Sequence, residues 1–306
     1  MRLRSGLRVL RRGADEVQVG TDPRWAVRVT GLAPDEVDVL VTGSLDAFPL
    51  LAGQLSRVGL AVEDTPTGPA SADDAAWGLL RPDDTAAARA RRRGTARVGI
   101  VGLGPTGVGV AVALAAAGVG TLELDDERPV RPTDVGVFRW QDVGIAREQV
   151  AARMVRDAAP RVAVGGRGEP DVVVVVESHG ADPARAALLV GHGVAHLSVV
   201  VREADTVVGP LVVPGAGPCL RCLDLHRAET DPAWPVLLGQ LVGADAADEP
   251  GTVAQVAAGV AAAAVLAVVD GLTPPVGRTW EVGLPDAIPR ERTWQPHAAC
   301  GCATLP

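Results

Sequence analysis

The feature that most restricts the fold of this chain is a glycine-rich turn near residue 100. A short apolar run, Arg97–Val101, leads into the segment 102–107, Gly-Leu-Gly-Pro-Thr-Gly, and an alanine-rich stretch follows over 108–117. This order predicts a strand, a tight turn and a helix. Glycines in such a turn let a phosphate approach the backbone, and the unpaired N–H groups that begin a helix attract anions.

A second apolar run, 121–124, ends in Asp125 and Asp126. An acidic residue at this place can accept hydrogen bonds from ribose hydroxyls. Strand, turn, helix and acid in this order are typical of a site for NAD, FAD or ATP, although a tight turn without any ligand gives the same pattern. Strands and helices continue to alternate to the end of the chain, which predicts a Rossmann-like α/β domain with a mainly parallel sheet over 95–306.

The first 65 residues have a different pattern. Three short alternating segments, 7–10, 17–19 and 25–29, predict a small antiparallel sheet. Apolar positions over 34–41 and 48–55 predict two helices, and 60–64 a last extended piece. Together they predict a winged-helix-like domain over 1–65. The segment 66–94 is rich in Pro, Ala, Asp and Arg without sustained periodicity, which predicts a linker.

Composition excludes several classes of function. The 29 basic residues are all arginine, so no mechanism can use a lysine, and the net charge of −8 argues against nucleic acid as a partner. The N-terminus lacks the apolar core of a secretory signal, so we expect a cytoplasmic protein. The uncharged segment 253–269 is alanine-rich and shorter than the ~20 residues of a membrane span, so we expect a buried helix and no membrane partner.

The four cysteines form two close pairs, Cys219 with Cys222 and Cys300 with Cys302. Two such pairs suit the four-ligand cage of a structural Zn²⁺, and a cytoplasmic location disfavours disulfides. The second pair is Cys-x-Cys where Cys-x-x-Cys is usual, which leaves His297 as a competing ligand. A redox dithiol and plain buried thiols are the alternatives.

The glycine turn, the acidic segment 125–127, the segment 142–147 and the terminal cysteines resemble the ThiF/MoeB/ubiquitin-activating-enzyme-like (E1-like) superfamily. This resemblance covers about two-thirds of the chain. It implies binding of ATP and Mg²⁺, adenylation of the C-terminal carboxylate of a peptide or protein, and a homodimer. It places Gly102, Gly104 and Gly107 around the phosphates and Asp125 on the ribose.

Three departures from the family pattern predict a degenerate ATP site. The segment 133–138 replaces a family motif whose arginine touches the triphosphate, and Arg139 is the nearest substitute. Arg147 stands where the family has its nucleotide-binding lysine, which keeps the charge but not the ammonium geometry. Glu177, followed by Ser178 and His179, is the only carboxylate where the family has a metal-contacting Asp-Asn pair.

A winged-helix-like module joined to such a domain resembles the leader-peptide-binding cyclodehydratase C-proteins of ribosomal-peptide maturation. The leading hypothesis is therefore a protein that binds a peptide or small protein along the edge of a strand, at 25–29 or the strands before it, and presents it to a partner enzyme. The alternatives are a working ATP-dependent adenylyltransferase that uses Asp125, Arg147 and Glu177, and a structural homodimer without chemistry. A DNA-binding role for the first module ranks last.

Overall fold

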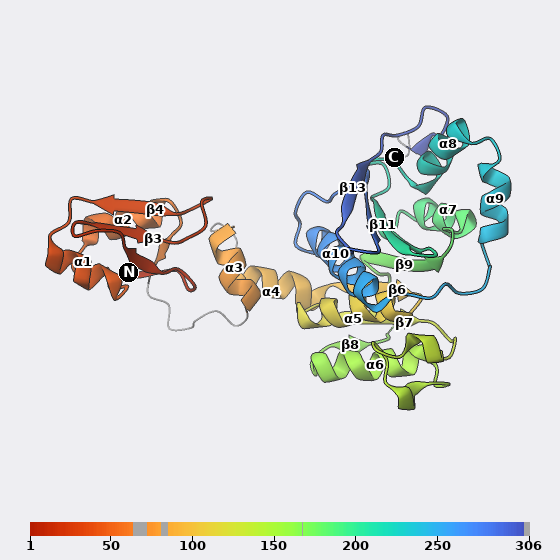
Figure 1. The fold of residues 1–306 in the computed structure, drawn as a ribbon, viewed down its shortest axis with the longest axis horizontal. Helices are drawn as coiled ribbons and strands as arrows, with labels where there is room; N and C mark the ends of the chain where they lie inside the picture. The colour runs from red at the N-terminus through yellow and green to blue at the C-terminus, as the bar shows by residue number, and fades with distance from the viewer. Residues whose placement is uncertain (64–71, 81–84, 167, 303–306) are drawn as a thin grey trace. The chain divides into compact units, whose positions relative to one another are not determined.

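The computed structural model describes residues 1–63, 72–80, 85–166 and 168–302. The chain divides into two compact units, Met1–Arg91 and Arg92–Pro306. Figure 1 draws their elements in chain order, from red to blue.

Residues 1–63 of the first unit form a three-stranded antiparallel sheet, a two-stranded sheet and two helices. The three strands follow the order β2-β3-β4, and β1 pairs with β5. The elements are β1 (Arg2–Leu3), β2 (Val9–Arg11), β3 (Glu16–Val19), β4 (Val27–Thr30), α1 (Pro34–Val41), α2 (Pro49–Arg57) and β5 (Ala61–Val62). The expected strands and helices of this segment are confirmed, and the winged-helix assignment stays a prediction.

A small core holds the first unit together. On the central strand β3, Val17 and Val19 are buried while their neighbours are only partly so, because alternate side chains of a strand point to opposite faces. Val37 and Leu40 of α1 complete this cluster. Glu36 accepts a hydrogen bond from the N–H of Ala33 at 2.7 Å and so closes the first turn of α1.

The segment 66–94 is a correction to the sequence prediction. Where a linker without sustained periodicity was expected, the structure shows two helices, α3 (Ala72–Leu80) and α4 (Ala86–Thr95). Alanine and arginine have high helix propensity even where apolar residues show no regular spacing, so a search for periodicity overlooks such helices. Residues 66–71 and 81–84 lie outside the described residues.

The second unit is built on an eight-stranded sheet with the order β13-β12-β11-β10-β9-β6-β7-β8. The five strands from β10 to β8 are parallel, and β11, β12 and β13 are antiparallel to their neighbours. This confirms the mainly parallel Rossmann-like sheet. The strands are β6 (Arg97–Val101), β7 (Thr121–Asp125), β8 (Ala163–Val164), β9 (Val172–Ser178), β10 (His196–Val201), β11 (Asp205–Val212), β12 (Arg278–Gly283) and β13 (Arg290–Thr293).

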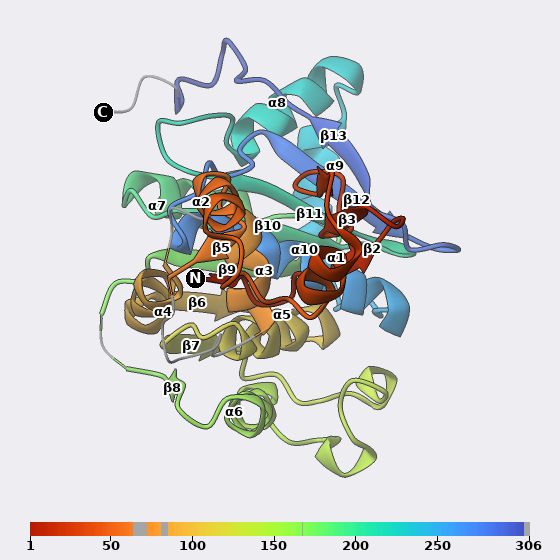
Figure 2. The same ribbon diagram turned by 90° about the vertical axis from the view of Figure 1, so that its left-hand side faces the viewer.

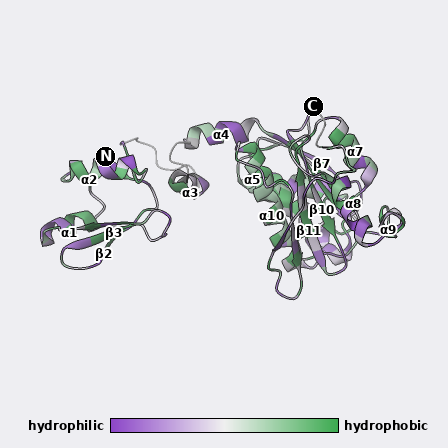
Figure 3. Ribbon diagram, turned by 90° about the horizontal axis from the view of Figure 1, so that it is seen from above, coloured by the Kyte–Doolittle hydropathy of each residue, from purple (hydrophilic) through white to green (hydrophobic). Residues whose placement is uncertain are grey.

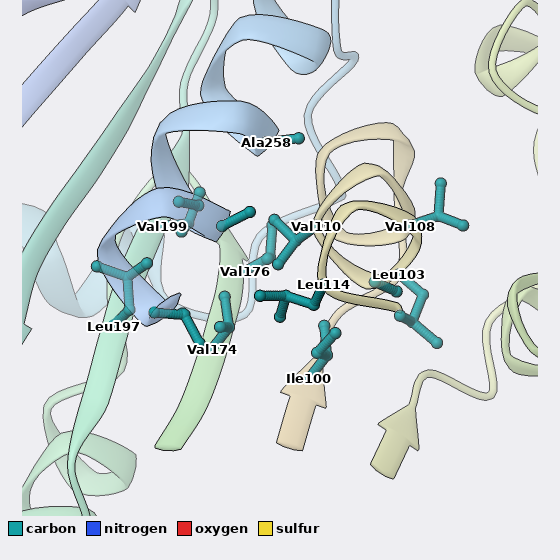
Figure 4. Packing of buried hydrophobic residues seen from close by; sticks show 14 of the residues in the cluster. Ile100, Leu103, Val108, Val110, Leu114, Val174, Val176, Leu197, Val199 and Ala258 are labelled. Carbon is teal, nitrogen blue, oxygen red and sulfur yellow. The ribbon is translucent and has the colours of Figure 1, made fainter. Parts of the chain in front are cut away.

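Helices cover both faces of this sheet, as Figures 1 and 2 show. On one face, α5 and α10 pack against Val174 and Val176 of β9 (Figure 4). On the other face, Val175 and Glu177 lie beside α7 and α8. The helices are α5 (Pro105–Ala116), α6 (Arg147–Ala158), α7 (Pro183–Gly191), α8 (Leu220–Thr230), α9 (Trp234–Leu241) and α10 (Gly251–Val269).

Among the described helices, α10 alone has the length and apolar composition that could cross a membrane. Eight of its residues are buried, seven of them in the main core, which confirms the expected buried helix. It packs closely on α5, since a Cβ added to Gly109 would lie 2.8 Å from the Cβ of Ala258. Figure 3 shows both helices in the green of apolar side chains. The apolar side chains of α10 therefore pack against the core of the second unit.

Candidate functional site

The glycine turn between β6 and α5 is too narrow for any side chain at two of its positions. Gly102 has a φ of +85°, and a Cβ there would lie 2.2 Å from the carbonyl oxygen of Val176. A Cβ on Gly107 would lie 2.0 Å from the carbonyl oxygen of Gly102. The helix α5 begins at Pro105, directly after the turn. The free N–H groups of its first turn therefore face the carboxyl edge of the parallel strands, the position at which this class of sheet binds ligands.

A carboxylate of the chain itself occupies this helix end. Glu249 accepts a hydrogen bond from the N–H of Thr106 at 2.8 Å. Its other oxygen lies 2.1 Å from where a Cβ on Gly104 would be, so Gly104 makes room for it. Burial raises the pKa of Glu249, against the opposing effect of its hydrogen bonds with Thr106. The end of α5 thus binds an anion already, and that anion is internal.

The loop that carries Glu249 is fixed on two sides. Arg131 donates hydrogen bonds to the carbonyl oxygens of Ala246 and Ala247, each at 2.9 Å. The N–H of Ala247 donates to the hydroxyl of Ser178 at 3.1 Å. Sequence reasoning missed Glu249 because it stands 143 residues from Thr106 and belongs to no motif. Only the folded sheet brings the two together.

Arg147, in the first turn of α6, lies buried between two aspartates. Its guanidinium is 2.5 Å from Asp134 and 3.4 Å from Asp126. Burial alone would raise the pKa of Asp126, but hydrogen bonds from Arg128 and from the N–H of Leu103 outweigh it and hold that pKa low. Burial also acts to raise the pKa of Asp134, and hydrogen bonds from Arg131 and Arg147 outweigh it and lower that pKa. The positive charge predicted at Arg147 is thus present beside the glycine turn and is already paired.

The remaining predicted nucleotide-site residues lie in three different places. The carbonyl oxygen of Asp125 accepts the N–H of Gly102 at 2.9 Å, and its exposed carboxylate has no hydrogen bond or ion pair within the described part of the chain. Arg139 is exposed at the start of a short 3₁₀ turn. Glu177 points to the α7 face, where Arg185 donates to it at 2.7 Å and the N–H of Asp182 at 3.3 Å. Burial raises the pKa of Glu177.

The structure therefore brings Gly102, Gly104, Gly107 and Arg147 together, with Asp125 beside them. It does not bring Glu177 into this group, because the side chain of Val176 faces the α5 side and the next side chain along a strand must face the other way.

The four cysteines form one cluster. Their sulfur atoms all lie within 4.8 Å of one another, a spacing that can hold a metal ion. The closest pairs are Cys219 with Cys300 at 3.5 Å and Cys222 with Cys302 at 3.3 Å. Gly301 has a φ of +72°, which allows the short Cys-x-Cys turn to direct both sulfurs inward.

The alternative ligand His297 is engaged elsewhere. Its Nε2 lies 2.8 Å from Glu229, and its Nδ1 accepts a hydrogen bond from the N–H of Ala299 at 3.1 Å. Its Nδ1 lone pair is therefore in use, and its Nε2 proton points to a carboxylate. The four sulfurs therefore form a metal-ligand group without His297, and His297 belongs to a second group, with His226 and Glu229, whose ligand atoms also lie within 4.8 Å of one another.

Comparisons with known proteins agree with this geometry. The model of the ThiF family matches residues 80–303 of the chain. This chain belongs to the ThiF family. The match confirms the resemblance drawn from the glycine turn, the acidic segment and the cysteines. No curated protein matches the chain in sequence.

Solved structures with the ThiF-type fold match along nearly the whole chain. Escherichia coli MccB with AMPCPP and MccA has a TM-score of 0.73, 17% identity and coverage of 99% of each chain. MccB with ATP has a TM-score of 0.70, 18% identity and coverage of 98% of each chain. PaaA has a TM-score of 0.66, 16% identity and coverage of 94% of this chain and 98% of that one. Because these structures are less than 20% identical to this chain in sequence, their likeness shows that the fold is shared.

Proposed function

We propose that this ThiF-family protein binds ATP at the glycine turn and uses it to activate a carboxyl group of a bound peptide. The contact between Glu249 and the N–H of Thr106 carries this proposal, because it shows an anion seated at the end of α5. Solved structures of MccB, described as a microcin C7 biosynthetic enzyme, hold ATP, AMPCPP or MccA. Their likeness extends over the N-terminal unit of this chain as well.

The residues around the turn fit a nucleotide. Gly102, Gly104 and Gly107 place no side chain between the backbone of the turn and a phosphate, and Arg147 supplies positive charge next to the turn. The exposed carboxylate of Asp125, at the end of β7, is free to bind ribose hydroxyls. Binding requires the phosphates to displace the carboxylate of Glu249. Arg147 then exchanges part of its pairing with Asp126 and Asp134 for the triphosphate.

The reaction is the transfer of an AMP group. An oxygen of the peptide carboxylate attacks the α-phosphorus, a new O–P bond forms, and the bond to the β-phosphate oxygen breaks to release pyrophosphate. The protein contributes mainly by holding the two reactants in line and by stabilising the charge that develops. Both oxygens of Glu177 are bound by Arg185 and Asp182, so we assign no Mg²⁺ ligand to Glu177.

The other parts of the molecule have supporting roles in this proposal. The strand β4 lies at an edge of its sheet, and such an edge can pair with an extended peptide. The four cysteines would hold a structural Zn²⁺, which would fix the C-terminal segment to the start of α8. With all four sulfurs on the metal, none is left to carry a thioester. The homodimer, the cytoplasmic location and the lack of a nucleic-acid partner stay predictions from the sequence.

Exchange of labelled pyrophosphate into ATP tests the proposal. Purified, zinc-loaded protein is incubated with pools of synthetic peptides that carry a free C-terminal carboxylate, and with the same pools as C-terminal amides. We expect exchange only with the free carboxylates, and none with Gly107→Val, which fills the turn. Asp248→Asn, next to Glu249 and exposed, is the control that should retain exchange.

The contact between Glu249 and the N–H of Thr106 also allows a second function, in which the carboxylate is never displaced. If Glu249 fills the phosphate position permanently, the protein binds a peptide and presents it to a partner enzyme, with a degenerate ATP site. Peptide binding without ATP binding at millimolar concentration would support this function and contradict the first. A structural homodimer without chemistry, the third hypothesis from the sequence, would bind neither.

A further inference from the structure

A cavity of about 640 Å³ lies on the α8 side of the sheet, lined by residues of β10, β11, α8 and β13. Three arginines from different elements line it: Arg202 after β10, Arg227 on α8 and Arg292 on β13. None of them belongs to the site at the glycine turn.

The charges of these arginines are only partly matched. Arg202 is paired with Asp205 through two hydrogen bonds of 2.7 and 2.5 Å. Arg227 contacts Asp224 at 3.2 Å, but the same carboxylate oxygen also accepts the indole N–H of Trp234. Arg292 has no hydrogen bond from its side chain and no ion pair among the described residues. Its guanidinium is the one without a carboxylate.

Two tryptophans hold the guanidinium groups in place. Arg292 lies over the ring of Trp294 at 4.2 Å, and Arg227 lies over Trp234 at 4.9 Å. Stacking uses the flat face of a guanidinium and leaves its N–H edge free for a carboxylate. Burial lowers the pKa of Arg227, and repulsion from Arg202 and Arg292 acts in the same direction. An anion in this cavity would relieve that repulsion.

A buried hydroxyl points to the same conclusion independently of the arginines. Ser198 on β10 is 1% exposed, lines the cavity, and has no hydrogen-bond partner for its Oγ among the described residues. A buried hydroxyl without a partner is costly, and a ligand that accepts its hydrogen bond removes that cost.

The acidic residues that line the cavity are already engaged. Glu229 contacts His297 at 2.8 Å, and Asp231 accepts the N–H of Ala233 at 3.0 Å. Among the described residues, neither the carboxylate of Glu229 nor that of Asp231 forms an ion pair or hydrogen bond with Arg227 or Arg292. These carboxylates therefore do not supply the missing partner.

The cavity adjoins the nucleotide site through His179. This residue lines the cavity, and its Nε2 lies 3.1 Å from the carbonyl oxygen of Asp245, in the loop that ends at Glu249. The carbonyl oxygen of Val176, three residues before His179, lies against Gly102, so at most about 10 Å of chain separates the turn from the cavity wall. A peptide whose C-terminus lies at the turn can place one of its preceding residues at this wall.

We propose that the cavity binds an acidic side chain, Asp or Glu, among the last three residues of the peptide substrate. This inference rests on the proposed function, because it takes the C-terminus of that peptide to lie at the glycine turn. Arg292 supplies the principal contact, Arg227 a second, and Ser198 donates its hydroxyl proton. An aspartate is thereby distinguished from asparagine by its charge, not by its size.

Calorimetric titration of the full, zinc-loaded chain at low salt tests the inference. The probes are acetylated pentapeptides of alanine with Asp or Asn at the last, second-last or third-last position, each with a free C-terminus and as the amide. We expect the Asp peptide of at least one pair to bind about tenfold more tightly, also as the amide. A preference lost on amidation would assign the site to the terminal carboxylate and overturn the inference, as would equal binding in all pairs.

Two matched variants complete the experiment. Arg292→Gln should abolish the preference, whereas Arg278→Gln, which removes the same charge from a position on β12 outside the cavity, should keep it; both arginines are exposed. If both variants weaken the preference for Asp equally, that preference comes from the net charge of the protein, and the assignment to this cavity is contradicted.

Pyrophosphate exchange separates failure of this inference from failure of the proposed function. Exchange that is equal for Asp and Asn peptides keeps the function and rejects the cavity assignment. A binding preference without any exchange keeps the cavity assignment and rejects the function.

Discussion

The glycine turn and the cysteine cluster both join distant parts of the chain. They differ in whether their charged and polar groups find opposite partners within the protein. At the turn, Arg147 is matched by Asp126 and Asp134, and the helix end by Glu249. In the cysteine cluster, the four sulfurs contact one another, and that of Cys302 also contacts a carbonyl oxygen. A site whose charges are paired within the protein is stable without its ligand, and the ligand must displace those internal partners in order to bind. A site of like groups depends on a cation from outside.

Removing one cysteine should have the largest effect. Cys219→Ser leaves three ligands, and because the energy of such a metal site is also folding energy, we expect the free energy of unfolding to fall by about 4 kcal/mol. Bound zinc should fall from one per chain to well below one. Metal analysis and chemical denaturation measure the two effects. His297→Gln, the control, should keep its zinc, and unchanged zinc in Cys219→Ser would reject the metal site.

Breaking the ion pairs at the turn should come next. Arg147→Met leaves the buried Asp126 and Asp134 with one fewer cationic partner each, which we expect to cost about 3 kcal/mol of unfolding free energy. Chemical denaturation measures the loss. Arg147→Lys keeps the charge and should lose less. A loss below ~1 kcal/mol in Arg147→Met would show that Arg128 and Arg131 suffice, and that the turn does not rely on Arg147.

The competition between Glu249 and ATP is tested by a milder change. Glu249→Gln removes the negative charge from the end of α5 but keeps its shape, so we expect ATP to bind about tenfold more tightly, a gain of about 1.4 kcal/mol. Calorimetry measures it. Asp248→Asn removes an equal charge one residue earlier and should change the affinity little. Weaker binding in Glu249→Gln would mean that the carboxylate assists ATP instead of excluding it.

The dependence of ATP binding on pH should show the smallest effect. Because burial raises the pKa of Glu249 above the ordinary value for glutamate, a fall in pH protonates it while most carboxylates stay charged. The loss of its charge weakens its hold on the end of α5, so ATP affinity should rise severalfold as pH falls through that pKa. In Glu249→Gln only the titration of ATP itself should remain. Parallel pH profiles for the two proteins would contradict this reasoning.

The sequence predicted those parts of the site that depend on neighbouring residues. The glycine turn, α5 and the end of β7 follow from local spacing, and the two cysteine pairs are visible as motifs. Glu249 and the partners of Arg147 could not be predicted, because their contacts depend on which strands lie side by side. Glu177 was placed by alignment with a family motif, which gives its position along β9 but not the face to which it points.

The loop 244–249 has a thermodynamic consequence for the two ligands. It contacts the end of α5 through Glu249 and the wall of the arginine cavity through His179. In the proposed function, a nucleotide that displaces Glu249 would therefore shift a segment that borders the peptide. By reciprocity, whatever factor ATP applies to the affinity of the peptide, the peptide must apply to the affinity of ATP. In the proposed function, coupling between the two substrates would thus be carried by residues 244–249, within the segment that joins α9 to α10.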